Sequence, residues 1–514
     1  MTTRPNGGES PTRLDDKIVA DDNSTDLKLE SVNSANKVSE VKSSEGYYNF
    51  EPIAALNLPD WRVTERALVR KLDFTLLPTL WVLYLNNYLD RTNIAQARLN
   101  TIEEDLNMGP EDYNIAVSVL TVGYMLAQLP SNMLLTRVRP GIYLPATVMI
   151  WSAVSASTAA ASSPETLFVI RFFLGITEAP LFPGAVYLMT CWYTRKELAL
   201  RTAILYSGLV LAQALSGVLA AGIFQMDGVS GLAGWQWLFI LEALMSVVCG
   251  VAAFWTLPDY PHSKTGSQTW SMNEDMRRLA EARMEADRVT GASGTAGIWH
   301  GVKLCLVDPK LYLFTLLNLT MTASYGFNFF FPTLLRGFNI GSNTVSLLLT
   351  APPYVTGAIV SFVLAWNSDR IKERGWHISG GLLAAAIGFI ITVATDGSAT
   401  IPRYVASFLY APGSFAANAL VYSWAVSTLS ATPEKRAAGG AIVNIIGHVG
   451  NIISPYFFRD EERPTYRLAF ILMLVFGGLA FGFAFSTKMF LKRTNKKLRE
   501  VASATGTVYS PYTT

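Results

Sequence analysis

Apolar residues fall into twelve long runs along the chain, separated by polar stretches. A helix needs about 20 mainly apolar residues to cross the roughly 30 Å hydrocarbon core of a bilayer. The runs are Leu72–Ala97, Asn114–Leu135, Ile142–Ala161, Thr166–Cys191, Thr202–Phe224, Trp237–Leu257, Leu311–Leu334, Val345–Trp366, Ile378–Thr395, Tyr404–Leu429, Ala437–Phe457 and Leu468–Met489. The pattern predicts an all-α membrane protein with twelve transmembrane helices.

The longest polar interruption divides these helices six and six. We expect a disordered cytosolic tail over residues 1–65, where Ser, Asn, Asp, Glu and Lys are frequent and large apolar side chains are few. The expected order is then a six-helix bundle (66–257), a cytosolic linker with a short surface helix (258–305), a second six-helix bundle (306–490) and a cytosolic tail (491–514).

Two basic loops at matching positions suggest that the bundles are related. Leu135–Pro140 follows the second run and contains Arg137 and Arg139, while Asn367–Gly375 follows the eighth run. Related halves with matching loops are typical of secondary transporters. The sequence therefore predicts two pseudo-symmetric six-helix bundles.

Composition and charge agree with a membrane location. Half of the residues are hydrophobic and 16% are charged, against about 25% in soluble domains. The net charge of +2 gives no sign of nucleic-acid binding. Lysine and arginine concentrate in the loops on the side of the long linker, which predicts that this side and both termini are cytosolic.

The fourth run carries two charges, Arg171 and Glu178, within an otherwise apolar sequence. An ion at mid-membrane is costly and usually faces a wet cavity or another charge. The two residues are seven apart, so one helix would place them on one face, about 10 Å from each other. A carboxylate near the midplane below an arginine suits a proton carrier beside an anion site.

Several motifs resemble the major facilitator superfamily, and within it the anion:cation symporter branch of the fungal allantoate permease type. The motifs are Tyr88-Leu89-Asp90-Arg91-Thr92-Asn93-Ile94, Arg171-x-x-x-Gly175-x-x-Glu178-Ala179, Pro183-Gly184, Trp235-x-Trp237-x-Phe239-x-x-Glu242, Phe331-Pro332-Thr333 and Asp369-Arg370-x-x-x-Arg374. That group contains carriers for allantoate, nicotinate, pantothenate, biotin and cysteine.

The resemblance implies roles for these residues. Asp90 and Glu178 would respond to protons, Arg91 would meet the substrate carboxylate, and Arg171 would link the substrate and proton sites. The first helix would then continue to about Ala97, with Asp90 and Arg91 facing the cavity. The cytosolic gate would contain Asp369, Arg370 and Arg374. The first copy of this gate loop has Thr136 in place of its usual acid.

Polar residues within other runs are candidates for the pocket. Helices one, two, five and seven usually line the cavity in this fold, which favours Tyr88, Tyr124, Gln213 and Asn328. The further candidates are Gln128, Tyr325, Asn418, Tyr422, Asn444, His448 and Asn451. Each of them, like Glu242, also fits a structural hydrogen bond between helices.

Together, the residues and the resemblance predict a multi-pass plasma-membrane carrier that imports a small organic carboxylate by proton symport with alternating access. The proton gradient would be its energy source, with no cofactor. The chain has no P-loop, catalytic triad or metal motif, so we do not expect an enzyme, and we expect a monomer in the lipid bilayer. The carboxylate would be vitamin-, ureide- or amino-acid-like. Two alternatives stay open: an efflux carrier for an acidic metabolite, and a nutrient receptor with little transport.

Overall fold

The computed structural model describes residues 51–514 apart from 55, 57, 59, 136, 264, 288–297, 339, 398, 430–432 and 506–510. Its described part is helical without a strand, and it contains one isolated bridge between Pro258 and Gly266. The fold class predicted from the sequence is therefore confirmed. Most of the expected N-terminal tail, residues 1–50, lies outside the described residues.

The N-terminal half consists of long helices joined by short turns. Its elements are α2 (Glu51–Ala54), α3 (Trp61–Ala97), α4 (Ile102–Asp105), α5 (Asp112–Leu135), α6 (Pro140–Ser157), η1 (Thr158–Ala160), α7 (Pro164–Glu178), α8 (Leu181–Trp192), α9 (Arg195–Ile223), η2 (Phe224–Met226), η3 (Val229–Gly231) and α10 (Gly234–Thr256).

A linker with three short helices leads to the C-terminal half. The linker holds α11 (Gln268–Ser271), α12 (Glu274–Ala286) and α13 (Ile298–Leu306). The elements that follow are α14 (Pro309–Ser324), η4 (Gly326–Phe329), α15 (Phe331–Gly337), α16 (Asn343–Leu348), α17 (Ala351–Ile371), α18 (Gly375–Ala394), α19 (Thr400–Thr428), α20 (Pro433–Ile453), η5 (Ser454–Phe457), η6 (Asp460–Glu462) and α21 (Arg467–Thr505).

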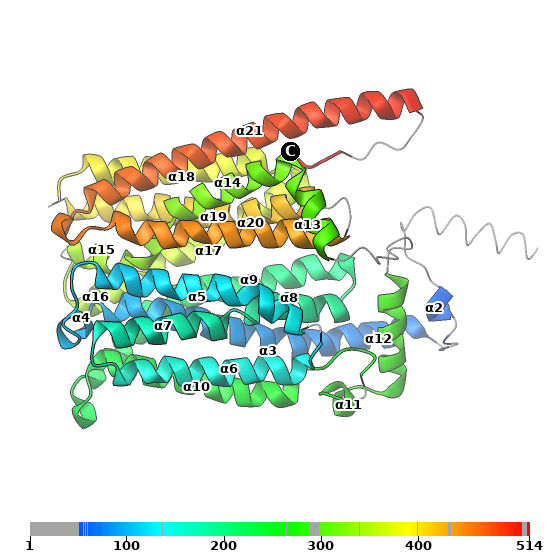
Figure 1. Ribbon diagram of the computed structural model, residues 1–514, viewed down its shortest axis with the longest axis horizontal. Coiled ribbons are helices and arrows are strands. Elements are labelled where there is room, and N and C mark those ends of the chain that lie inside the picture. Colours follow the sequence, from blue (N-terminus) through cyan, green and yellow to red (C-terminus); the bar gives the residue numbers. More distant parts are fainter. Residues whose placement is uncertain are drawn as a thin grey trace, which may run out of the picture.

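Figure 1 shows the helices of the two halves lying roughly parallel, with α4, α15 and α16 at one end and α2, α11, α12 and α13 towards the other. By length and mean hydropathy, seven described segments qualify as membrane spans, or eight when the bent pair His300–Leu306 and Pro309–Phe329 counts as one. Helices α3, α5, α19 and α20 occupy the other four predicted runs. Charged, amide or imidazole side chains within these four helices reduce their hydropathy.

The fourth predicted run forms one span, Pro164–Trp192, as expected. Helix α7 ends at Glu178 and α8 begins at Leu181, but Ala179 and Pro180 between them keep right-handed helical dihedral angles. Pro180 explains the local loss of helical hydrogen bonding, because its ring removes a backbone donor. Glu178 therefore lies directly before a proline turn, within a span that continues past it.

Two other boundaries differ from those expected. Helix α21 continues to Thr505, so the predicted cytosolic tail from residue 491 is helical over much of its length. The surface helix of the linker is α12, and one side of it is buried. Arg283 forms ion pairs with Glu65 and Glu197 of the N-terminal half.

The last four residues, 511–514, pack against the C-terminal half. The backbone of Tyr512 exchanges two hydrogen bonds with the Asn495 side chain. Trp424 Nε1 donates to the carbonyl oxygen of Thr513 at 2.8 Å. The backbone N–H of Arg374 donates to Thr514 O at 2.9 Å. This segment therefore contacts the loop between α17 and α18.

The two halves meet through α5 against α20 and through α9 against α16 and α17. The contact at α9 is close: a Cβ on Gly217 would collide with Thr350 Oγ1 and with the carbonyl oxygen of Leu347. A small residue is needed at this point for the helices to approach so closely.

Candidate functional site

An ion pair joins the first and fourth predicted spans. Arg91 Nε of α3 lies 2.6 Å from Glu178 Oε2 at the end of α7. The Glu178 side chain is completely buried, whereas Arg91 is 16% exposed. Glu178 Oε1 has no hydrogen-bond partner. The arginine is thus the more accessible member of the pair.

Two glycines allow α5 and α7 to pack closely beside this pair. A Cβ on Gly175 would collide with the carbonyl oxygen of Leu120, and one on Gly123 would collide with the carbonyl oxygen of Phe172. This close crossing brings Tyr124 of α5 towards Glu178, which lies one turn after Gly175 on α7.

Tyrosine rings surround the Arg91 guanidinium. Its Cζ lies 4.3 Å from the ring centroid of Tyr124 and 5.2 Å from that of Tyr88. Such cation–π contacts hold a guanidinium while leaving its N–H groups free for an anion. The Tyr124 ring also meets His448 of α20 edge-on, at 5.3 Å between centroids. The Arg91 site therefore reaches the C-terminal half.

His448 was one of several open candidates in the sequence, and the structure brings it to this site. Its Nδ1 lies 3.2 Å from Asn451 Nδ2. No charged residue adjoins His448 in the sequence, so its proximity to the arginine site arises only from helix packing.

Asp90 does not share the environment of Arg91, and the expectation that both face the cavity was wrong. Its carboxylate accepts hydrogen bonds from Trp151 Nε1 (3.1 Å) and Ser155 Oγ (2.9 Å) of α6. A third comes from Ser246 Oγ of α10 at 3.3 Å. Adjacent helical residues point about 100° apart, so Asp90 is buried inside the N-terminal bundle when Arg91 faces the other half.

Arg171 forms no ion pair among the described residues, although Glu178, which was expected near it, is the acid that acts on it most strongly. None of its three guanidinium nitrogens has a hydrogen-bond partner, and the side chain is buried. Its Cζ lies 6.0 Å from the ring centroid of Phe239 on α10. Glu178 is bonded to Arg91 instead.

The other pocket candidates divide between the two halves. Gln213 Oε1 of α9 accepts a hydrogen bond from Tyr325 at 3.3 Å, which crosses between the halves. Asn328 Oδ1 accepts one from Tyr354 at 2.9 Å, within the C-terminal half. Gln213 is thus at the interface of the halves, while Asn328 is held by its own bundle.

A charge cluster that the sequence analysis missed joins the halves at the α4 end. Arg98 lies 2.6 Å from Glu103 and 2.9 Å from Asp460. Arg463 lies 3.2 Å from Glu103 and 2.8 Å from Asp460. We call these four residues the α4-side lock. The sequence showed an acidic loop there, but 362 positions separate Arg98 from Asp460.

Uncharged contacts support the α4-side lock. Tyr113 donates to the carbonyl oxygen of Phe329 at 2.7 Å, and Ser118 donates to that of Ile452 at 3.1 Å. Asn343 Nδ2 donates to the carbonyl oxygen of Leu99 at 3.1 Å. The two halves are therefore bonded together at the α4 end.

The predicted gate loop is only partly paired. Arg374 Nη2 lies 3.4 Å from Asp369 Oδ1, and Arg374 Nη1 donates to Ser427 Oγ at 2.9 Å. The Arg370 guanidinium lies over the Trp366 ring. The acid of this loop with the most hydrogen bonds is Glu373.

Glu373 receives hydrogen bonds from three groups around the start of α18. The Trp376 backbone N–H donates at 2.7 Å, His377 Nδ1 lies at 2.9 Å, and Lys488 of α21 completes the set. Burial alone would raise the pKa of Glu373, but these contacts outweigh burial and hold that pKa below its ordinary value.

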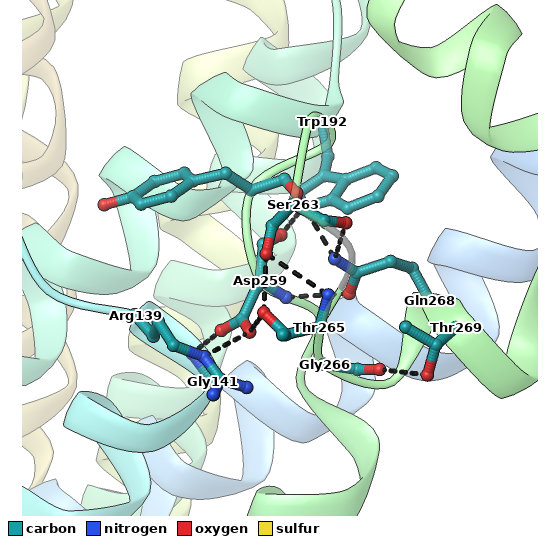
Figure 2. A network of polar contacts seen from close by, with 10 residues as sticks. Arg139, Gly141, Trp192, Asp259, Ser263, Thr265, Gly266, Gln268 and Thr269 are labelled. Atoms are coloured by element: carbon teal, nitrogen blue, oxygen red, sulfur yellow. Dashed lines mark hydrogen bonds and ion pairs between the residues drawn. The ribbon is translucent and has the colours of Figure 1, made fainter.

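The matching loop of the N-terminal half obtains its acid from elsewhere in the chain. Figure 2 shows Asp259, which follows α10, between Arg139 and the start of α6. Its carboxylate accepts from Arg139 Nε (2.9 Å), from the Gly141 backbone N–H (3.0 Å) and from Thr265 Oγ1 (2.7 Å). This loop therefore has an ion pair although position 136 is a threonine rather than an acid.

The site consists of an arginine, two tyrosine rings and a buried carboxylate that pairs with the arginine. Among the described residues, no group of three or more His, Cys, Asp or Glu side chains is arranged to hold a metal ion.

Two bundles of long apolar helices that meet around a buried polar site are the arrangement of a membrane transporter. The chain matches the Major Facilitator Superfamily over residues 80–455 and belongs to that superfamily.

Similar proteins agree with this membership. The MFS-type transporter cnsO of Penicillium expansum is 33% identical over 87% of this chain and 86% of its own length. A putative tartrate transporter of Agrobacterium vitis is 30% identical over 80% of this chain and 92% of its own length. A bacterial homologue of the human lysosomal transporter Spinster, solved in an inward-facing, unoccupied conformation, has a TM-score of 0.67 over 81% of this chain and 97% of that one. That structure is 17% identical and shows the fold alone.

Proposed function

We propose that this transporter imports a small organic carboxylate together with a proton, as a member of the anion:cation symporter branch. The observation that carries the proposal is the Arg91–Glu178 ion pair, in which the accessible cation is held by an internal carboxylate. Arginine binds carboxylates through two parallel charge-assisted hydrogen bonds. A substrate carboxylate fits the place that Glu178 now occupies.

Proton coupling follows from this competition. When Glu178 takes up a proton it loses its charge, and Arg91 is released to bind the substrate carboxylate. When the substrate leaves, Glu178 gives up its proton and pairs with Arg91 again. Substrate and proton therefore enter together because each requires the other to neutralise the site. Asp90 is the second proton-responsive acid of this proposal.

The direction of transport rests on the proposed topology. With both termini in the cytosol, the α4-side lock would close the extracellular end. The basic loops on the terminal side support this orientation. The plasma membrane is the proposed location.

The name of one relative supports the carboxylate class. Tartrate, which names the Agrobacterium vitis relative, is a small hydroxylated dicarboxylate. We extend to this chain only the shared chemistry, a carboxylate for Arg91.

The test is uptake by the purified full chain in proteoliposomes with an imposed pH gradient. The panel contains nicotinate, pantothenate, biotin, allantoate, cysteine and tartrate. We expect one of them to accumulate only when the outside is acidic. Glu178→Gln is expected to lose accumulation and keep substrate exchange. Glu165→Gln, an exposed acid at the start of the same helix, should behave as the wild type.

Three outcomes would contradict parts of the proposal. Accumulation only under the opposite gradient would establish an efflux carrier. Saturable binding without flux would establish a receptor. Normal proton-driven accumulation by Glu178→Gln would remove the coupling role from this residue.

A further inference from the structure

Helix α10 carries an acid that the proposed transport cycle does not use. Glu242 lies in the middle of this apolar helix, and its side chain is 2% exposed. Neither of its carboxylate oxygens has a hydrogen-bond partner. The sequence left open whether Glu242 titrates or forms a structural hydrogen bond, and the structure shows no such bond.

The packing of α10 against α3 places another unbonded side chain opposite Glu242. Asn86 Nδ2 lies 3.5 Å from Cys249 Sγ, and Ser246 Oγ lies 3.3 Å from Asp90 Oδ2. Residue numbers rise along α3 as they fall along α10, so the next turn sets Asn93 against Glu242. Both polar atoms of the buried Asn93 side chain also lack a partner.

The charged group beside Glu242 is another acid, Asp90 of α3. Arg171 lies 6.0 Å from the ring of Phe239, three residues before Glu242 on α10, but the acids that act on this arginine are Glu178 and Asp90. Among the described residues, the buried Glu242 carboxyl group therefore has no cation beside it.

The other polar and charged groups on the helices around Glu242 are bonded to residues other than Glu242. Helix α3 presents Asp90, whose carboxylate is bonded to α6 and to Ser246. Helix α6 contributes Trp151 and Ser155 to those bonds, and neither of them titrates. Asp227 caps the first turn of α10 through the Gly234 N–H. The charged Glu197 and Arg201 of α9 bond to Arg283 and Asp73 near the opposite end of the half.

An ionised carboxylate without a donor is strongly disfavoured in such surroundings. We propose that Glu242 is a further proton-binding site, separate from the Arg91 site and from Asp90, which holds a proton in the described conformation. This inference extends the proposed proton symport and assigns it a proton carrier inside the N-terminal bundle.

Infrared spectroscopy of the full chain in proteoliposomes tests this without any substrate. A protonated carboxyl group has a C=O stretching band above the amide I region that shifts in D2O. At neutral pH we expect Glu242→Gln to lose one carboxyl's share of this band, and Glu242→Asp to move it. Glu165→Gln, which removes an exposed acid, should leave the band unchanged.

Size-exclusion profiles identify the folded variants, and Glu242→Asp keeps the test valid if Glu242→Gln does not fold. An unchanged band in folded Glu242→Gln would overturn the proposal, as would an unchanged band in Glu242→Asp when only that variant folds. A band that disappears on adding Na⁺ at constant pH would also overturn it in favour of a sodium site. Because the readout needs no transport, failure of the uptake panel would leave the result standing.

Discussion

Asp259 and Glu373 form matching ion pairs in the two halves, but acid and base have exchanged positions. Asp259 follows α10 and pairs with Arg139 in the α5–α6 loop. Glu373 lies in the α17–α18 loop and pairs with Lys488 on α21. Each acid also accepts a hydrogen bond from the backbone N–H of a helix's second residue. Asp259 accepts from Gly141 of α6, and Glu373 accepts from Trp376 of α18. The halves thus form the same contact with opposite charge order.

Asp259 is expected to matter more for stability than its partner Arg139. Asp259→Asn would leave buried donors without a carboxylate and reduce the free energy of unfolding by about 2–4 kcal/mol. Arg139→Gln should cost about 1 kcal/mol or less, because the Arg139 side chain is 48% exposed. Thermal unfolding of the purified variants in detergent measures both. Equal losses would contradict the central position of Asp259.

Glu373 predicts a specific loss of stability in acid. Its pKa in the folded chain lies below the ordinary value, so the unfolded chain binds the proton first as the pH falls. Its contribution is complete above about pH 4.3 and is lost as the pH falls through the lower folded value. Glu373→Gln should therefore reduce the melting temperature at neutral pH, and the difference from the wild type should disappear in acid. The exposed Asp275→Asn on α12 is the control, with little effect at either pH.

Arg91→Lys should impair binding more than its conserved charge suggests. Lysine keeps the cation but loses the planar pair of donors. One lost charge-assisted hydrogen bond is worth about 1.5–3 kcal/mol, so KM should rise roughly 10- to 100-fold for the transported carboxylate. Arg70→Lys changes an exposed arginine of the same helix and should leave KM unchanged. An unaltered KM in Arg91→Lys would mean that substrate binds elsewhere.

The α4-side lock should be cooperative. In a double-mutant cycle of Arg98→Gln and Asp460→Asn, we expect a coupling energy of about 0.5–3 kcal/mol in thermal unfolding. Spin labels at the exposed positions Glu104 and Glu461 should report longer distances in either variant. Glu461→Gln changes an exposed acid that follows Asp460 and is not part of the α4-side lock, so it is the matched control for stability. Additive effects would show that the ion pairs do not hold the halves together.

The helices were predictable from the sequence, but their partners were not. Helices occupy each of the twelve predicted runs, although only seven or eight described segments qualify as membrane spans by length and hydropathy alone. The pairing of Arg91 with Glu178, 87 positions away, depends on how α3 and α7 are rotated against each other. The sequence placed Arg171 and Glu178 on one helix face, about 10 Å apart. It carried no signal that Arg91 of another helix would bond to the acid.

Helix rotation also explains why the adjacent residues Asp90 and Arg91 lie in different environments. Asp90 and Arg91 formed one motif in the sequence, yet one lies inside a bundle and the other faces the opposite half. Hydropathy cannot assign faces when a helix is polar on more than one side. Tertiary packing makes that choice, through Trp151 and Ser155 in one direction and Tyr124 in the other.

The exposed position of the α4-side lock makes its ion pairs sensitive to the salt around the protein. Arg463 is 41% exposed and Glu103 is 25% exposed, so dissolved ions reach both. Screening acts over about 8 Å at physiological ionic strength and over shorter distances in stronger salt. Salinity at that surface would therefore set how firmly the resting carrier stays shut. Two preparations that differ only in their buffer salt would then begin a transport assay from different mixtures of open and closed molecules.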